Sequence, residues 1–433
     1  MWMLASAVLG ITLLPAPAAA EELIRVLLYQ DAHRVQAEAD SDLVVRLPGG
    51  EPRVVASTLV ITPLPRAILV NGEHIALDRV IVTGEGRDVH VTAEEPIRTP
   101  NETSGLKLSP AVFVRARSGS RQEEAAKRSS GSARREKARQ AANAGLPKGL
   151  VVGGELEILS DGERLAVVNH LDLEEYVQGV VPAEMPASWH PEALKVQAVA
   201  ARTYVLHQKM LRADQAYDVV ATVLDQVYRG RSVVNDRVRL AVEETKGLVL
   251  THHGRPILAT FSSTAAGPTE DAANVWSKDL PYLKGVDCPF DTSSPFYRWR
   301  TSFGLQALEQ KLKEAGLKVG TIATLTPYIY SAAGRVAKLR ILHSMGELVL
   351  SGQDLRRIVG YRVIPSTQFT LDEVGPDVFL SGYGSGHAVG LCQWGAKELA
   401  ELGYPFSAIL AYYYPGTRLS RSWSLDPIDT PTP

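Results

Sequence analysis

The sequence predicts an α+β fold rich in β-strands, and two observations support this prediction. Short apolar runs of strand length, bounded by Gly, Pro, Asp and Asn, dominate the first part of the chain. Stretches with helical features occur further along, and they do not alternate regularly with strand-like runs. A doubly wound parallel sheet requires that alternation, so an α+β arrangement is favoured. We expect a large α+β domain with a few helices, preceded by a small β-rich module.

The composition is that of an ordinary globular protein. The chain has 433 residues, of which 45% are hydrophobic and 22% are charged. This length suffices for one large core or for about two to three domains. The formal net charge of −2 gives no electrostatic argument for binding nucleic acid, so no nucleic-acid partner is expected.

Residues 1–20 have the pattern of a signal peptide. An apolar stretch too short to span a bilayer comfortably ends in small residues at Ala18 and Ala20, followed by acidic residues. The segment has no Lys or Arg, which leaves open a buried N-terminal segment or an uncleaved anchor. We expect export to the periplasm or cell wall. No later stretch is apolar enough to predict a transmembrane span after signal cleavage.

Two regions precede the large domain. Residues 21–114 form the predicted β-rich N-terminal module, in which no cluster resembles a functional site. Residues 115–148 are basic, with few large apolar side chains, and predict a flexible insertion. Such a segment could attract anionic wall polymers or phospholipid headgroups, but a solvated loop is the preferred interpretation.

Residues 149–420 are expected to form one continuous domain. Helices are predicted over Pro191–Arg212, Leu305–Glu314 and Leu391–Leu402, between strand-like runs. The last helix should stop at Gly403. The proline-containing segment 421–433 is predicted to be a disordered tail.

A carboxylate at position 184 is the strongest candidate for catalysis. Asp172 and Glu175 predict a capping box that opens a short helix ending near Gly179. Pro182 and Pro186 then bracket Glu184, which predicts a stiff, non-helical loop.

The neighbours of Glu184 suit a general acid. Met185 and Trp189 are apolar, and a carboxyl group in apolar surroundings has a raised pKa because burial disfavours its charged form. A general acid that works near neutral pH needs such a pKa. A solvent-exposed loop residue or a helix-entry cap is the alternative interpretation of Glu184.

Lys195 and Arg202 lie seven residues apart on the helix predicted to start at Pro191. At 3.6 residues per turn they share one face, roughly 10 Å apart along the axis. This face could grip a polar polymer, or it could be an ordinary exposed face.

The two cysteines, Cys288 and Cys392, are far apart in sequence. They could form one disulfide in an oxidising compartment or remain buried thiols. Because they lack a CxxC spacing, they give poor support for zinc, and no metal or other cofactor is expected.

The sequence resembles the SpoIID/LytB family of sporulation and cell-wall proteins. The resemblance begins in YVQGVVPAEMPASWHPEALKVQAVAARTY, residues 176–204. It continues in order through six further blocks: DQVYRG (225–230), AVEETKGLVLTHHGRPILATFSSTAAGPT (241–269), VWSKDLPYLKGVDCP (275–289), SGQDLRRIVG (351–360), GYGSGHAVGLCQWGAKELAELG (382–403) and YYYPGT (412–417).

The resemblance implies a peptidoglycan lytic transglycosylase. It makes Glu184 the acid/base that cleaves between N-acetylmuramic acid and N-acetylglucosamine, leaving a 1,6-anhydro end. One carboxylate would then suffice, unlike the paired carboxylates of ordinary glycosidases. The residues that the resemblance places along the glycan groove are Lys195, Arg202, Ser262, Ser263, Tyr282 and Lys284.

His387 and Gln393 belong to the glycine-rich block near the C-terminus. His387 could hydrogen-bond substrate or orient Gln393, or it could cap or pack within the turn. The chain departs from the family at Ala388 and Cys392, in the basic insertion, and at Val219–Asp225, which lacks the Cys/His zinc ligands of some members.

Three other functions remain open. A hydrolase would pair Glu184 with a second carboxylate, Asp225 or Glu270, and would release reducing ends. The LytB branch implies a non-catalytic, glycan-binding enhancer of a cell-wall amidase. A secreted β-rich adhesion or scaffold protein agrees less well with the ordered blocks.

Overall fold

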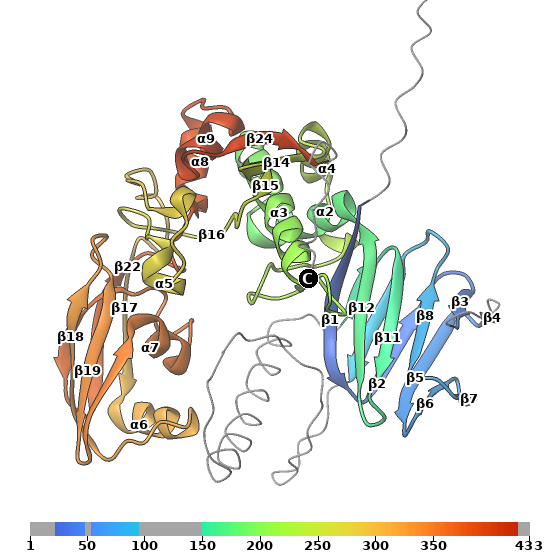
Figure 1. Ribbon diagram of the computed structural model, residues 1–433, viewed down its shortest axis with the longest axis horizontal. Coiled ribbons are helices and arrows are strands. Elements are labelled where there is room, and N and C mark those ends of the chain that lie inside the picture. The colour runs from blue at the N-terminus through green and yellow to red at the C-terminus, as the bar shows by residue number, and fades with distance from the viewer. Residues whose placement is uncertain (1–21, 48–52, 95–148, 423–433) are drawn as a thin grey trace, which may run out of the picture.

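A computed structural model describes residues 22–47, 53–94 and 149–422 (Figure 1). The α+β fold class is confirmed, because the described residues form several mainly antiparallel sheets, with helices that do not alternate regularly with the strands. The predicted signal peptide and the predicted basic insertion lie outside the described residues. So do residues 423–433 of the predicted tail. Arg421, its first residue, is the last residue of a strand.

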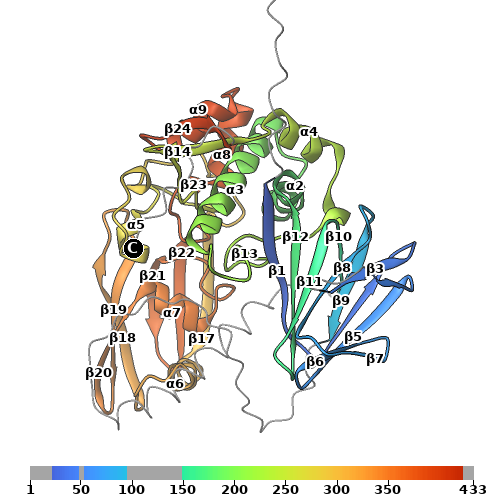
Figure 2. The same ribbon diagram turned by 45° about the vertical axis from the view of Figure 1, so that its right-hand side comes forward.

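Two sheets form a β-sandwich at one side of the molecule (Figures 1 and 2). Their apolar side chains alternate with exposed ones, as in Val35, Ala37, Leu59 and Ile61, which are all fully buried. The strands of the first sheet are, in spatial order, β13 (Val219–Val220), β1 (Leu23–Ala32), β12 (Leu165–Asp172), β11 (Glu155–Ser160), β8 (Arg79–Thr83), β3 (Leu43–Arg46) and β4 (Arg53–Val55). Those of the second are β10 (Gly149–Val152), β9 (Val89–Glu94), β2 (Arg34–Glu38), β5 (Thr58–Leu64), β6 (Ala67–Val70) and β7 (Glu73–Ile75).

The sandwich extends across the expected domain boundary at residue 149. β11 pairs with β8, β10 pairs with β9, and β12 pairs with β1 along most of its length. Residues 149–172 therefore share both sheets with the N-terminal strands. The expected boundary does not separate the sheets, because these apolar strands bury their inner faces against N-terminal partners.

Helices follow directly after β12 and carry the chain to the centre of the molecule. α3 (Pro191–Leu211) lies between the sandwich and the other half of the protein in both views, and almost every residue from Ala193 to Leu206 is buried (Figures 1 and 2). Pro191 occupies its first turn, as predicted. The other elements of this central part are α2 (Leu173–Glu184), η1 (Arg231–Val233), α4 (Asp236–Glu244), α8 (Gln393–Glu401), α9 (Phe406–Tyr413) and the sheet β15 (Arg255–Pro256), β14 (Leu248–His252), β24 (Arg418–Arg421).

A second hydrophobic core lies within the segment predicted to be one continuous domain. Leu312, Leu339 and Leu355 are fully buried in it, and it forms a cluster distinct from the main core. Its elements are β17 (Arg298–Gly304), α6 (Leu305–Glu314), β18 (Ile322–Tyr330), β19 (Val336–His343), β20 (Gly346–Ser351), α7 (Gly352–Val359), β21 (Gln368–Val374) and β22 (Asp377–Tyr383). The remaining elements contribute apolar residues to the main core: β16 (Phe261–Ser262), α5 (Ala272–Trp276), η2 (Pro281–Leu283) and β23 (Leu391–Cys392).

None of the helices in the described residues combines the length and the apolar character needed to cross a bilayer.

Candidate active site

Helix α2 places Glu184 at its C-terminal end. Asp172 caps the start of the helix and accepts hydrogen bonds from the backbone N–H groups of Glu174 and Glu175, at 2.8 and 3.2 Å. The helix does not end near Gly179, and Glu184 is not on a non-helical loop: α2 continues through Pro182 to Glu184. Buried Val177, Val180 and Val181 on this helix offset the hydrogen bond that Pro182 cannot donate.

The end of α2 is fixed by the residue before the second proline. Met185 is extended, with φ −141° and ψ 133°, which is the conformation favoured before Pro186. Its N–H still donates to Val181 O, at 3.0 Å. Glu184 thus lies on a rigid helix end that enters the core.

The carboxyl group of Glu184 contacts the loop between β13 and η1. Glu184 Oε1 accepts a hydrogen bond of 2.6 Å from Val227 N. The residue retains partial exposure, yet protein surrounds its carboxyl group, and this burial raises the pKa of Glu184 to about 7. The Val227 N–H and the positive charge of Arg229 oppose the shift without cancelling it. The predicted raised pKa is therefore supported by the geometry.

Gln393 holds the backbone of Glu184 from the opposite side. Gln393 Nε2 donates to Glu184 O and to Gln197 Oε1, both at 3.1 Å. This contact joins the start of α8 and the middle of α3 to the end of α2. Within the described residues Gln197 Nε2 is buried without a hydrogen-bond partner. Such an unsatisfied donor costs free energy, and functional sites are where it is most often retained.

Two indole rings lie beside this junction. Trp189 follows α2, and its ring centroid is 4.9 Å from that of Trp394, in an edge-to-face arrangement. Lys397 Nζ lies 5.5 Å from the Trp394 ring centroid. Both indoles are partly exposed, so they offer apolar surface next to Gln393.

Lys195 and Arg202, which the family resemblance places along the glycan groove, both form ion pairs in the structure. Lys195 Nζ lies 2.7 Å from Glu192 Oε1 and 2.6 Å from Glu244 Oε2, in ion pairs near the start of α3. Arg202 is fully buried and pairs with Glu174. Their shared helical face is an interior face at Arg202, because α3 is covered by its neighbours.

Ser262, Ser263 and the glycine-rich block lie together. β16 and β23 pair in parallel, with Ser262 opposite Cys392. Ser262 Oγ accepts from Ala388 N at 3.1 Å, and Ser263 O accepts from Trp394 N at 3.1 Å. These serines therefore support the segment that carries Gln393.

His387 has a structural environment in the turn. Its Nδ1 accepts a hydrogen bond of 3.0 Å from Val389 N, and its ring packs edge-on against Trp276 at 5.0 Å. Burial lowers the pKa of His387 to about 3, so the ring stays neutral. Among the described residues, the Gln393 side chain is oriented by its hydrogen bonds to Gln197 Oε1 and Glu184 O, and His387 instead bonds within its own turn.

Tyr282 and Lys284 lie on η2 and just after it. Tyr282 is buried, its hydroxyl accepts from Leu258 N at 3.4 Å, and its ring is 5.4 Å from that of His252. Lys284 is exposed and pairs with Asp271 and Asp279. These contacts of Tyr282 and Lys284 do not involve Glu184.

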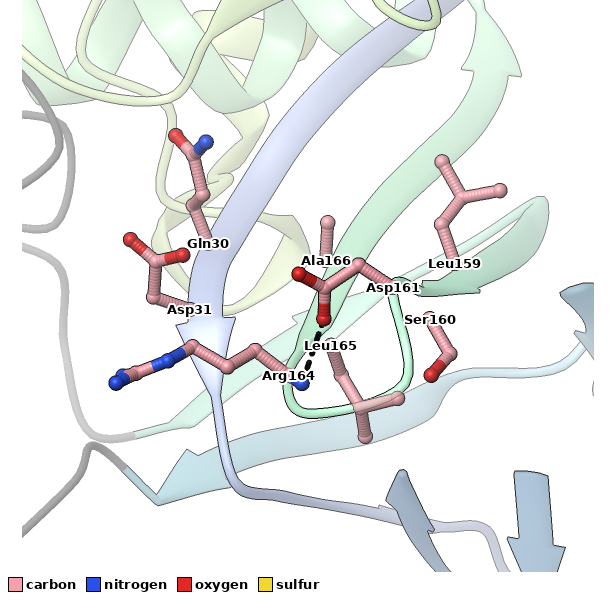
Figure 3. Close-up of a pocket in the computed structure, with 8 residues that line it drawn as sticks. All are labelled: Gln30, Asp31, Leu159, Ser160, Asp161, Arg164, Leu165 and Ala166. Atoms are coloured by element: carbon pink, nitrogen blue, oxygen red, sulfur yellow. Dashed lines mark hydrogen bonds between the residues drawn. The ribbon is translucent and has the colours of Figure 1, made fainter. Parts of the chain in front are cut away.

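A small pocket on the sandwich is remote from this junction in the fold. It lies at the turn that joins β11 and β12, and α2 follows the opposite end of β12 (Figure 3). Arg164 N donates to Asp161 Oδ1 across this turn, at 2.8 Å. The pocket contains none of the predicted site residues.

Sequence reasoning missed the residues that hold Glu184 from other segments. Gln197, Val227 and Arg229 were not singled out. Val227 and Arg229 belong to the DQVYRG block, which is one of the blocks that carry the family resemblance. That membership was the sequence feature that could have indicated them.

These observations define the chain as an α+β protein with a buried, protonatable carboxyl group at a helix end. A family model described as Stage II sporulation protein (SpoIID) matches residues 161–252, and one for a domain of unknown function (DUF8618) matches residues 270–390. The chain belongs to the SpoIID/LytB family.

Its relatives include Stage II sporulation protein D of Bacillus subtilis (strain 168), 33% identical over 270 residues, which cover 59% of this chain and 76% of the relative. An uncharacterized protein of Brachyspira hyodysenteriae is 33% identical over 269 residues, covering 62% and 72% of the two chains. The amidase enhancer of Bacillus subtilis is 33% identical over 292 residues, covering 56% of this chain and 40% of the enhancer.

Proposed function

We propose that this protein is an exported peptidoglycan lytic transglycosylase of the periplasm or cell wall, with Glu184 as its single acid/base. The observation that carries the proposal is the burial of the Glu184 carboxyl group at the end of α2, which raises its pKa to about 7. A group with this pKa is available both as an acid and as a base at neutral pH. Membership of the SpoIID/LytB family supports the choice of a wall glycan as substrate.

In the proposed reaction Glu184 first protonates the glycosidic oxygen that leaves N-acetylmuramic acid. The resulting carboxylate then removes the proton from the muramic 6-hydroxyl, which closes onto C1 as a 1,6-anhydro ring. Every proton is returned to Glu184, so no water is consumed. The partly exposed indoles of Trp189 and Trp394 are suited to contact the apolar face of a sugar ring.

The hydrolase alternative is disfavoured because both candidate second carboxylates are already occupied. Asp225 accepts hydrogen bonds from Tyr204, Arg212 and Val220 N. Glu270 accepts from Asn274, Ser331 and Asp271 N. A general base needs a free lone pair directed at water, which these contacts do not leave readily available.

Product analysis tests the proposal. Denuded glycan strands and whole peptidoglycan are incubated with the protein, with Glu184→Gln, and with Glu243→Gln as a control on the exposed surface of α4. Mass spectrometry should detect anhydro-muramic ends with wild type and Glu243→Gln, and none with Glu184→Gln. Reducing ends, heavier by one water, would instead identify a hydrolase.

The relative named amidase enhancer favours a second candidate function, a non-catalytic glycan-binding enhancer of a cell-wall amidase. This function predicts no cleavage by any variant and stimulation of an added wall amidase that Glu184→Gln retains. The same incubations, repeated with an amidase, separate the two functions.

A further inference from the structure

The two cysteines and an aspartate form a buried cluster outside the Glu184 junction. Cys288 and Asp291 follow η2, and Cys392 ends β23 immediately before α8. Cys288 and Cys392 are 1% exposed and Asp291 is 0% exposed. Their potential ligand atoms all lie within 4.8 Å of one another.

Asp291 is only partly satisfied by its surroundings. Its Oδ2 accepts from Ala266 N at 2.7 Å and from the Cys392 thiol at 3.2 Å. Its Oδ1 is buried and has no hydrogen-bond partner among the described residues. A buried carboxylate whose oxygen accepts no hydrogen bond lowers the stability of the fold unless it is paired with a cation or coordinates a metal ion.

The sulfur atoms are surrounded by donors that suit thiolates. Ala265 N and Gly395 N each donate to Cys392 Sγ at 3.4 Å. The Tyr413 hydroxyl lies 3.2 Å from Cys288 Sγ. Hydrogen bonds of this kind orient metal ligands and tune them.

A buried cation is positioned to balance negative charge at the cluster. Arg335 is 3% exposed, and its guanidinium donates to Ala265 O and Pro268 O, both at 2.7 Å. Ala265 is also the residue whose N–H reaches Cys392. Ala265 thus links the Arg335 guanidinium to Cys392 Sγ, and the positive charge of Arg335 interacts with Cys288, Asp291 and Cys392.

We propose that Cys288, Asp291 and Cys392 bind one thiophilic divalent metal ion, for which Zn²⁺ has the matching ligand preference. Thiolate and carboxylate ligands suit zinc, and a Zn–S distance of about 2.3 Å separates neighbouring ligands by roughly 3.7 Å. The ligand atoms of the cluster lie within 4.8 Å of one another, and Cys392 Sγ is already 3.2 Å from Asp291 Oδ2, so zinc binding requires only small side-chain adjustments. Binding releases one proton from each thiol, and the complex of two thiolates, one carboxylate and Zn²⁺ carries one negative charge, which Arg335 offsets.

The expectation of no metal was based on the absence of a CxxC spacing between the two cysteines. The fold brings these distant cysteines together, which the sequence pattern does not indicate. The alternative of a Cys288–Cys392 disulfide agrees less well with the contacts. A disulfide would remove the thiol proton that Cys392 donates to Asp291, and it would leave that buried carboxylate with the Ala266 N–H alone.

The proposed site would stabilise the start of α8. The Cys392 sulfur caps this helix by accepting from Gly395 N, and the next residue is Gln393, which holds Glu184 O. A metal ion there would fix the segment that supports the Glu184 junction. The metal site does not depend on the proposed transglycosylase activity.

Zinc titration of the reduced, metal-free protein tests the site. Zn²⁺ should bind with one ion per chain, slow alkylation of both cysteines, and release protons. Co²⁺ should give a thiolate-to-metal charge-transfer absorption. Cys288→Ser and Asp291→Asn should weaken zinc binding by at least about 10- to 100-fold, the loss caused by removing even an outer hydrogen-bond partner of a ligand.

Asp287→Asn is the matched control, because Asp287 is an exposed carboxylate next to Cys288. It should bind zinc as wild type does. Circular dichroism establishes that each variant is folded. Wild-type thiols whose alkylation zinc does not slow, equal zinc affinity in Asp291→Asn, or a disulfide that re-forms in place of zinc binding would each overturn the proposal.

Discussion

The two ends of helix α2 carry the same residue type in opposite circumstances. Glu174, in the first turn, accepts hydrogen bonds from Arg202 Nε at 2.9 Å and Nη2 at 2.6 Å. Gly247 N adds a third, at 3.0 Å. The positive end of the helix dipole also favours a carboxylate there. Glu174 is thus a fully compensated negative charge.

Glu184, at the last residue of the same helix, has much less compensation. One backbone N–H, from Val227, donates to its carboxyl group, and the charge of Arg229 acts on it. The negative end of the helix dipole opposes ionisation. The comparison teaches that burial alone does not make a carboxyl group reactive. A buried carboxyl group with few hydrogen-bond donors and cations around it keeps its proton near neutral pH and can transfer it.

The largest effect is expected from a substitution that removes this transferable proton. Glu184→Gln should lower glycan cleavage by about 100- to 10,000-fold, the usual contribution of a positioned acid/base. Its unfolding midpoint should not fall, because the neutral amide replaces an unfavourably buried acid. Rates of anhydro-end formation and urea unfolding measure both. A large loss of stability would make Glu184 a structural residue like Glu174.

The next largest effect is expected from removing the ion pair between Arg202 and Glu174 at the start of α2. Arg202→Met should destabilise the protein by about 3 kcal/mol, because it breaks an ion pair of a fully buried arginine and leaves the partly buried Glu174 without its charged partner. Adding Glu174→Gln should recover part of that loss. Urea unfolding of the single and double variants provides the measurement. A raised KM with unchanged stability would instead indicate that Arg202 binds the glycan, as the family resemblance implied.

A pH series sharpens the comparison. Burial raises the pKa of Glu184 from 4.5 to about 7, so the folded protein binds a proton more tightly than the unfolded chain between these values. Stability should therefore fall as pH rises through this window, by at most about 3 kcal/mol. Glu184→Gln should lack this component. Parallel stability curves for wild type and the variant between pH 4.5 and 8 would contradict the raised pKa.

The smallest effect concerns Lys195. Lys195→Met should cost at most about 1 kcal/mol, because its ion pairs with Glu192 and Glu244 lie near the surface. Thermal unfolding and glycan-binding titrations measure this variant. A several-fold weaker affinity for glycan strands, without a change in unfolding, would support the groove position that the family resemblance implied.

The sequence was sufficient for features that depend on local contacts. The Asp172 cap and the helix start at Pro191 follow from residues within one turn of each other, and the structure contains both. The apolar neighbours of Glu184 were also adjacent in sequence. Local propensity failed at Pro182, where buried valines keep the helix intact through a residue that usually ends it.

Features that depend on distant partners could not be predicted from the sequence. Arg202 appeared to lie on an exposed face because its partner Glu174 lies 28 residues away. The contacts of Glu184 with Val227 and Gln393 join segments 43 and 209 residues apart. The strands of residues 149–172 likewise found their partners in the N-terminal sheets, so neither their register nor the shared core was visible in the local pattern.

The most direct test of the central claim is a carbon-13 NMR titration of the glutamate carboxyl groups. The resonance that disappears in Glu184→Gln is assigned to Glu184 and followed from pH 4 to pH 9. Our account predicts a midpoint near 7, because burial raises this pKa. A midpoint near 4.5 would mean that Glu184 is already ionised at neutral pH, and it would contradict the assignment of Glu184 as the general acid.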